Sequence, residues 1–187
     1  MPLDADTART RLLDTAEDLF YARGIQAVGM DDLRSGSGLS LKRLYALYPA
    51  KEQLVEAYLR RRDLRWRGRL AAFVAEVESP DYRILAVFDW LRSWFREPGF
   101  RGCAWVNSHG ELGATSEVVA RAAREHKQAF ADYLTGLVTA ANLPTTLAPQ
   151  LFLLAEGAMV SAGILDDPRQ ADHARAAAES LMARSTR

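Results

Sequence analysis

Apolar residues recur along most of the chain at spacings of three and four, with polar residues between them. This period is typical of amphipathic α-helices, and no segment alternates convincingly as a strand would. Prolines and glycines stand between the periodic segments, where they end helices. The pattern predicts an all-α fold, with helices over residues 7–23, 30–37, 41–47, 51–77, 82–96, 117–142, 147–165 and 170–184, and a shorter segment within 101–113.

The helix expected at 41–47 has defined ends. Ser40 offers a hydroxyl that can cap its first turn, and Pro49 disfavours helical geometry at Tyr48. Gly24 and Gly38 stand where the two preceding helices end, Gly24 in the position of a left-handed cap. A helix of fewer than three turns is not stable alone. Other elements must therefore hold it in place.

A helix, a glycine-containing turn and a second short helix form the helix-turn-helix pattern. In that motif the second helix enters the DNA major groove, and its first residues meet base edges. Lys42 and Arg43 would project outward, Arg43 being suited to guanine because its fork matches two acceptors. Tyr45 would lie at the rim, and Lys51 would lie near a phosphate. We expect DNA contacts from Ser40, Leu41, Lys42, Arg43, Tyr45, Leu47 and Lys51.

Two simpler interpretations stay open for the cations. A Lys-Arg pair on a helix is often only a solvated face. The arginine run within residues 60–69 is interpreted as a solvated face too, although its first members could approach the DNA backbone.

Residues 12–59 resemble the DNA-binding domain of the TetR family of bacterial transcriptional regulators. The matching residues are Ala16, Leu19, Phe20, Gly24, Met30, Leu33, Gly38, Leu39, Ser40, Leu44, Tyr45, Tyr48, Lys51, Glu52 and Leu54. Val28-Gly29 and Ala50 depart from the family pattern, which usually has Ser or Thr caps there. The resemblance implies a three-helix helix-turn-helix domain at residues 1–50, linked by the helix at 51–77 to a ligand-binding and dimerisation domain within 51–187.

The resemblance also implies a ligand cavity in the second half, where aromatic residues cluster and His126 interrupts an apolar stripe. The expected lining is Phe88, Leu91, Trp94, Trp105, Asn107, His109, His126, Phe130, Tyr133, Phe152 and Met159. Aromatic walls with few polar groups suit a small apolar or aromatic effector and disfavour strongly anionic ones. The same residues could equally form a filled core.

Cys103 lies in a segment that resembles one found in a subset of TetR-like regulators, some of which sense electrophiles or oxidants through a cysteine there. The neighbouring charge of Arg101 could favour its thiolate. The other interpretation is a small buried apolar residue. Asn107, His109 and Glu111 are weak metal candidates, because two-residue steps do not share a helix face. We expect no metal and no cofactor.

The last two expected helices are rich in small residues among large aliphatic ones. In the resembling family such helices pair with their copies, so a homodimer on a palindromic double-stranded operator is implied. We place the dimer interface at Ala155, Ala158, Ala162 and Leu181.

Composition mainly excludes classes of protein. The formal net charge is zero, so bulk charge gives no argument for a polyanion partner. A single cysteine suits a reducing compartment, and neither a signal peptide nor an apolar run of about 18 residues is seen, so we expect a cytoplasmic protein that does not enter the membrane. The histidines His109, His126 and His173 are scattered, and no nucleophile stands beside an obvious base. We therefore expect a ligand-responsive repressor rather than an enzyme.

Overall fold

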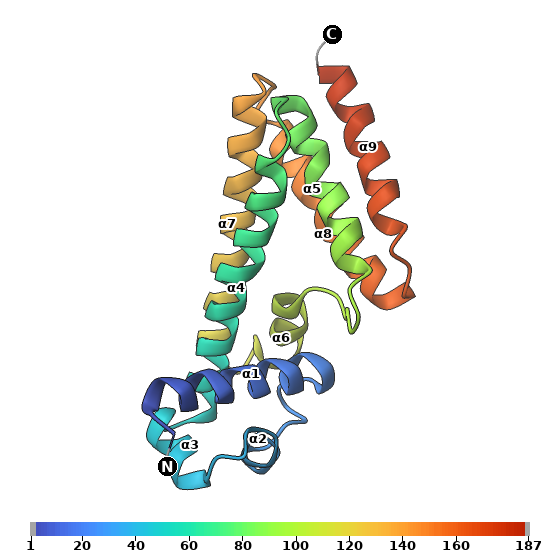
Figure 1. Cartoon of the computed structure of the whole chain (residues 1–187). Coiled ribbons are helices and arrows are strands. Elements are labelled where there is room, and N and C mark those ends of the chain that lie inside the picture. Colours follow the sequence, from blue (N-terminus) through green and yellow to red (C-terminus); the bar gives the residue numbers. More distant parts are fainter. Residues whose placement is uncertain (1–2, 186–187) are drawn as a thin grey trace. The chain divides into compact units, whose positions relative to one another are not determined.

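The computed structural model describes residues 3–185, and within that range it contains nine helices and no strand (Figure 1). The all-α prediction is confirmed, and the predicted ends agree with the observed ones to within three residues. The helices are α1 (Ala5–Arg23), α2 (Met30–Ser37), α3 (Leu41–Leu47), α4 (Lys51–Ala75), α5 (Pro80–Phe95), α6 (Ala104–Leu112), α7 (Glu117–Ala140), α8 (Leu147–Leu165) and α9 (Gln170–Ser185).

The chain forms two compact units. The first unit comprises residues 1–63 and 104–124, and the second comprises 64–103 and 125–187. This division differs from the expected boundary at residue 50, because the long helices α4 and α7 each continue from one unit into the other. The short helix α6 belongs to the first unit.

The first unit is built around the apolar faces of α1, α2, α3 and the start of α4. Leu12, Leu33, Leu44 and Leu54 are fully buried, and Phe20 packs edge-on against Tyr58. Asp4 caps α1 by accepting hydrogen bonds from the backbone of Asp6 and Thr7. These buried side chains hold α2 and α3, which are too short to persist alone, against α1 and α4.

The glycines that end α1 and α2 behave differently. Gly38 is left-handed, with φ 66° and ψ 13°, as a helix-ending glycine commonly is. Gly24 has φ 90° and ψ 153°, outside the left-handed region expected for it, although its N–H still donates to the Phe20 carbonyl at 2.9 Å. The chain therefore leaves α1 in an extended direction.

The core of the second unit is aromatic. The ring of Trp66 on α4 lies 5.0 Å from Trp90, 5.6 Å from Trp94 and 5.3 Å from Phe130, centroid to centroid. These are edge-on arrangements at the spacing that aromatic pairs prefer. Helix α5 packs against α8 and α9, and α8 packs against α9.

Helix α8 is long and apolar enough to cross a membrane by length and composition. Core helices of soluble proteins pass the same test, and one such helix is weak evidence. One side of α8 is buried against α5 and α9, with Leu151, Ala155 and Met159 fully covered. We interpret α8 as a packing helix.

Candidate DNA-binding and effector sites

Helix α3 is held by its apolar side and its caps. The backbone N–H of Arg43 donates to Ser40 Oγ at 3.3 Å, so the expected cap of α3 is present. Tyr48 follows the helix in an extended conformation, φ −139° and ψ 99°, as a residue before proline prefers. Leu44 is fully buried, and α3 contacts both α1 and α2. The cap and the buried face together fix its orientation.

The outward side of α3 carries the side chains expected to contact DNA. Lys42 is exposed, and Tyr45 is 47% exposed. Leu41 and Leu47 are half-buried. Arg43 is half-buried, and its Nη2 donates to the backbone carbonyl of Leu3 at 3.2 Å. A base contact by Arg43 therefore uses its other N–H donors or displaces this neutral acceptor.

Lys51 is directed toward the protein. Its Nζ donates to the Ile25 carbonyl at 2.6 Å and lies 5.7 Å from the centre of the Phe20 ring. Burial lowers the pKa of the ammonium group, while Glu111 and Asp32 oppose that shift. The phosphate contact expected of Lys51 requires its ammonium group to leave the Ile25 carbonyl.

The second and third arginines of the α4 run, Arg61 and Arg62, are bound by carboxylates of α1. Arg61 lies 2.8 Å from Asp14 and 3.0 Å from Glu17, and Arg62 lies 2.8 Å from Glu17. The Arg62 guanidinium also covers the Tyr21 ring at 3.9 Å. At these two positions the interpretation as a solvated face is wrong, because the cations tie α4 to α1.

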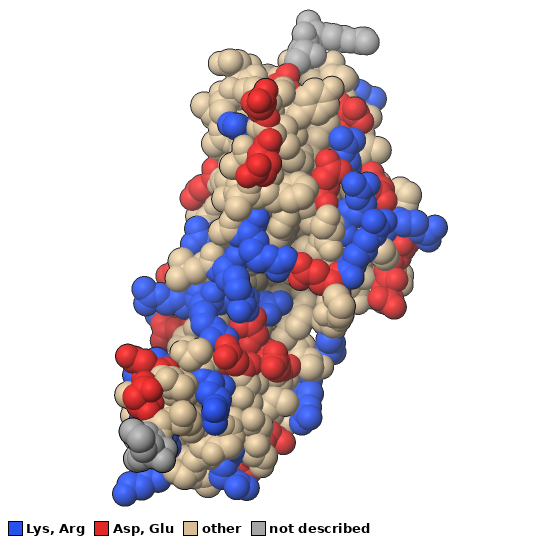
Figure 2. Space-filling model, viewed as in Figure 1, with Lys and Arg blue, Asp and Glu red and all other residues tan. Residues whose placement is uncertain are grey.

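Figure 2 shows Lys and Arg atoms gathered across the middle of the visible face, with Asp and Glu atoms at the border of this group and mixed with cations elsewhere on that face. This agrees with a formal net charge of zero. Bulk charge therefore gives no argument for DNA binding, and the argument rests on individual side chains.

A capped short helix held on two others, with Lys42 and Tyr45 outward, defines a helix-turn-helix DNA-binding regulator. Two family models match the chain: "Bacterial regulatory proteins, tetR family" over residues 12–58, and "Tetracyclin repressor-like, C-terminal domain" over residues 80–178. The chain belongs to the TetR family of transcriptional regulators. Members of this family are regulators rather than enzymes. They are soluble cytoplasmic proteins that bind DNA operators as dimers, and response to a ligand is typical of them.

Individual relatives agree with this assignment. A TetR-family regulator from Streptomyces coelicolor is 32% identical, with 97% of each chain covered and a TM-score of 0.89. Reduced NemR from Escherichia coli is 23% identical, covers 93% of this chain and 96% of its own, and has a TM-score of 0.84, a likeness of fold. An uncharacterised helix-turn-helix regulator of Mycobacterium tuberculosis is 31% identical over 121 residues. That match spans 62% of this chain and only 59% of the relative.

Most of the residues expected to line the effector cavity are packed into the core. Phe88, Leu91, Trp94, His126, Phe130 and Met159 are buried, whereas Tyr133 and Phe152 are half-buried. His126 lies 5.1 Å from Trp66, ring to ring. Trp105, Asn107 and His109 lie on α6 in the first unit, where Trp105 is buried and the other two are exposed. The expected set is therefore divided between the two units.

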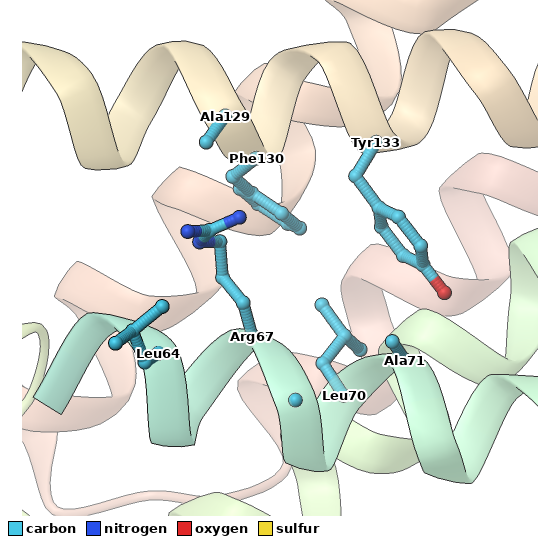
Figure 3. Close-up of a pocket in the computed structure, with 8 residues that line it drawn as sticks. Leu64, Arg67, Leu70, Ala71, Ala129, Phe130 and Tyr133 are labelled. Carbon is cyan, nitrogen blue, oxygen red and sulfur yellow. The ribbon is translucent and has the colours of Figure 1, made fainter. Parts of the chain in front are cut away.

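A cavity of about 270 Å³ opens between α4 and α7 in the second unit (Figure 3). Of the expected residues, Phe130 and Tyr133 line it. The others that line it are Leu64, Arg67, Gly68, Leu70, Ala71 and Ala129. The side chains from α4 were missed because that helix was interpreted as an arginine-rich solvated face. The recurrence of Leu64, Arg67, Leu70 and Ala71 at helical spacing was the available signal.

Two polar groups belong to this cavity. Figure 3 shows Arg67 rising from α4 toward Ala129 and Phe130, and Tyr133 descending from α7 with its hydroxyl near Ala71. Burial raises the pKa of Tyr133, and the charge of Arg83 opposes that shift. The phenol is therefore a protonated donor at neutral pH.

Cys103 has a charged neighbour other than the expected one. Its thiol is buried, and Lys127 Nζ lies 3.3 Å from Sγ while also binding a carboxylate oxygen of Glu156. Arg101 is exposed. The segment is closely packed, because a Cβ added at Gly163 would lie 2.8 Å from the Gly102 Cα.

The weak metal candidates do not gather. Over residues 3–185, no group of three or more His, Cys, Asp or Glu side chains could hold a metal ion. Glu111 instead accepts a hydrogen bond from the Gln26 backbone at 2.8 Å. It thereby holds α6 to the turn after α1.

The alanines expected at the dimer interface lie inside the protomer. Ala155, Ala158 and Ala162 are buried, and Leu181 is half-buried. The expectation is corrected for the three alanines, because α5 and α9 already cover that side of α8. The uncovered side carries Leu153 and Ile164, which are 68% and 76% exposed, with Val160 between them.

Proposed function

We propose that this protein is a homodimeric transcriptional repressor that a small molecule releases from its operator. The observation that carries the proposal is the capped helix α3, held on α1 and α2 with Lys42 and Tyr45 outward. An effector acts by preferring the dimer whose two α3 helices no longer match adjacent major grooves. DNA and effector then weaken each other by the same factor.

DNA binding can be tested without knowing the operator. A duplex is first selected from a random library with the full-length protein, and its affinity is then measured by fluorescence anisotropy at several salt concentrations. We expect a selected palindrome with half-sites about one helical turn or more apart. The proposal is contradicted if the selection gives no preferred sequence. It is also contradicted if the double variant Lys42→Ala, Tyr45→Ala binds the duplex as tightly as the wild type.

The dimer is proposed to form through the exposed side of α8, on Leu153, Val160 and Ile164. Exposed apolar side chains in such a row suit a contact with a second copy, since together they form an apolar patch. Ile164→Arg should give monomers in size-exclusion chromatography with light scattering, because a charge would be buried unpaired. Tyr82→Arg is the matched control, since Tyr82 is also an exposed apolar residue. A dimeric Ile164→Arg variant, or a monomeric control, contradicts this interface.

A second candidate function keeps DNA binding and makes Cys103 the sensor. The contact between Lys127 Nζ and Cys103 Sγ, at 3.3 Å, favours it because reactive cysteines commonly lie beside a cation. N-ethylmaleimide supplies an electrophilic alkene: the thiolate sulfur bonds to one alkene carbon, and the other carbon takes a proton from water. If this candidate is right, the reagent abolishes duplex binding by the wild type and not by Cys103→Ser. Equal loss in both proteins counts against it.

A further inference from the structure

We propose that the cavity between α4 and α7 binds an apolar organic acid, a molecule with a hydrocarbon or aromatic body whose carboxylate is held by Arg67. The inference rests on the proposed function, because it names the effector class of such a regulator. It changes the expectation that anionic ligands are disfavoured, since that expectation overlooked the cations of α4.

The body of the ligand is specified by the walls. Leu64, Leu70, Ala71, Ala129 and Phe130 present hydrocarbon to the cavity. Burying apolar surface there contributes roughly 25 cal/mol per Å² before the costs of association. The volume of about 270 Å³ lies just below the usual range for ligand pockets, about 300 to 1,000 Å³. A single aromatic ring with a short chain, or a medium-length aliphatic chain, matches that size.

The charged end of the ligand is specified by Arg67. In Figure 3 its side chain rises toward Ala129 and Phe130, which line the same cavity, so a bound anion would meet it beside an apolar wall. A guanidinium carries five N–H donors in a fixed fork and can serve a carboxylate together with another acceptor. An anion gains this attraction, whereas a neutral molecule of the same shape does not.

The other end of the cavity carries a weaker polar group. The Tyr133 hydroxyl lies near Ala71, away from Arg67 (Figure 3). The charge of Arg83 acts on the pKa of Tyr133. Positive charge is therefore present near Tyr133 as well as at Arg67. A polyhydroxylated anion such as a sugar phosphate is disfavoured, because its hydroxyls would lose water against Leu70 and Phe130.

The test compares acids with their uncharged amides on the full-length protein without DNA. Octanoate, 4-phenylbutyrate, octanamide, 4-phenylbutanamide and glucose 6-phosphate are titrated by isothermal calorimetry. We expect at least one acid to bind at least tenfold more tightly than its own amide, and glucose 6-phosphate not to bind. If neither acid binds with a Kd below about 1 mM, or if acid and amide bind alike, the proposal is wrong.

Variants locate the site. Arg67→Met should weaken the bound acid at least tenfold and leave its amide unchanged, and Tyr133→Phe should have a smaller effect. The matched control is Arg69→Met, because Arg69 lies on the same helix, does not line the cavity and is paired with Glu97. Arg67→Lys keeps the positive charge but not the forked guanidinium, and should bind the acid with intermediate affinity. It keeps the test possible if the Arg67→Met protein misfolds. Unchanged acid affinity in both Arg67 variants places the acid elsewhere.

A separate measurement distinguishes this inference from the proposed function. The acid that binds is added to the protein on its selected duplex, and anisotropy reports release. Binding in calorimetry without release supports the cavity assignment and contradicts its use as a switch. Duplex binding with no calorimetric binding of any acid leaves DNA recognition standing and overturns the cavity assignment.

Discussion

On α3, Lys42 is exposed and Arg43 reaches only a backbone carbonyl, whereas on α4 Arg61 and Arg62 are bound by carboxylates of α1. All four are cations on helices of the first unit. A carboxylate that already holds an arginine competes with a phosphate for it, but a neutral carbonyl competes little. What surrounds each cation in the folded chain therefore separates those that can serve DNA from those that hold the protein together.

Glu17 provides the largest expected effect. Glu17→Ala leaves Arg61 and Arg62 without a buried partner carboxylate, which should cost about 3 kcal/mol of unfolding free energy. The lower end of the usual range applies because Arg61 keeps Asp14 and is partly exposed. Urea denaturation followed by circular dichroism measures this, with Asp18→Ala as control because Asp18 is exposed on the same helix. Similar midpoints for the two variants would show that the α4 cations are not structural.

Arg43 should show the reverse behaviour. Arg43→Ala is expected to cost about 1–3 kcal/mol of binding to the selected duplex and to relax preference at one base pair. Its unfolding free energy should change little, because it gives up only the hydrogen bond to Leu3. Arg60→Ala is the comparison on α4, since Arg60 is exposed there. If Arg43→Ala binds the duplex with the affinity and selectivity of the wild type, Arg43 does not contact the bases.

Lys51 combines both kinds of contact. Lys51→Ala should cost about 1 kcal/mol of stability, because the Ile25 carbonyl loses its donor. If the ammonium also turns to a phosphate in the complex, affinity falls for all sequences and the salt slope drops by about one. Stability loss with an unchanged slope would make Lys51 purely structural.

The same residue predicts a pH dependence. The folded-state pKa of Lys51 lies below 10.5, so the unfolded chain binds more protons between the two values. The stability that comes from this shift is present above pH 10.5 and is lost as the pH falls through the folded-state pKa. Lys51→Met should flatten that rise in thermal melts between neutral and alkaline pH. A rise of equal size in the variant would assign it to other groups.

Asp167 provides the smallest effect. Its pKa is lowered to about 2, first by the hydrogen bond from the exposed Arg169 side chain. Its contribution is present above about pH 3.8 and is lost as the pH falls through about 2. Because exposed pairs are screened by solvent, Asp167→Asn should barely move the melting temperature at neutral pH. A loss of stability as large as that of Glu17→Ala would show that an ion pair stabilises this protein to the same extent whether or not it is buried.

The sequence was informative where local chemistry decides the structure. Ser40, Gly38 and Pro49 act on their own neighbours, so the ends of α2 and α3 followed from residue type. The second unit is decided by packing between distant segments. Which side of α8 is covered depends on α5 and α9, so Ala158 was placed at an interface although it is buried. The part of α4 that lines the cavity was missed because Arg67 looked like its solvated neighbours. The side chain of Lys51 could not be placed, because its acceptor is 26 residues away.

The two glycines beside Cys103 constrain how this chain can evolve. A side chain at Gly163 would strike the Gly102 backbone, and a side chain at Gly102 would be strained by its φ of +80°. The obstacle at Gly163 is steric and the one at Gly102 is conformational. Replacing one glycine therefore does not make the other replaceable. In a saturation library selected for repression, both codons should tolerate almost no replacement, whereas Gly136, around which an added Cβ meets nothing within 4 Å, should accept many residues. Proteins that evolve from this one should therefore keep Gly102 and Gly163 even where the residues on the surrounding surface have changed.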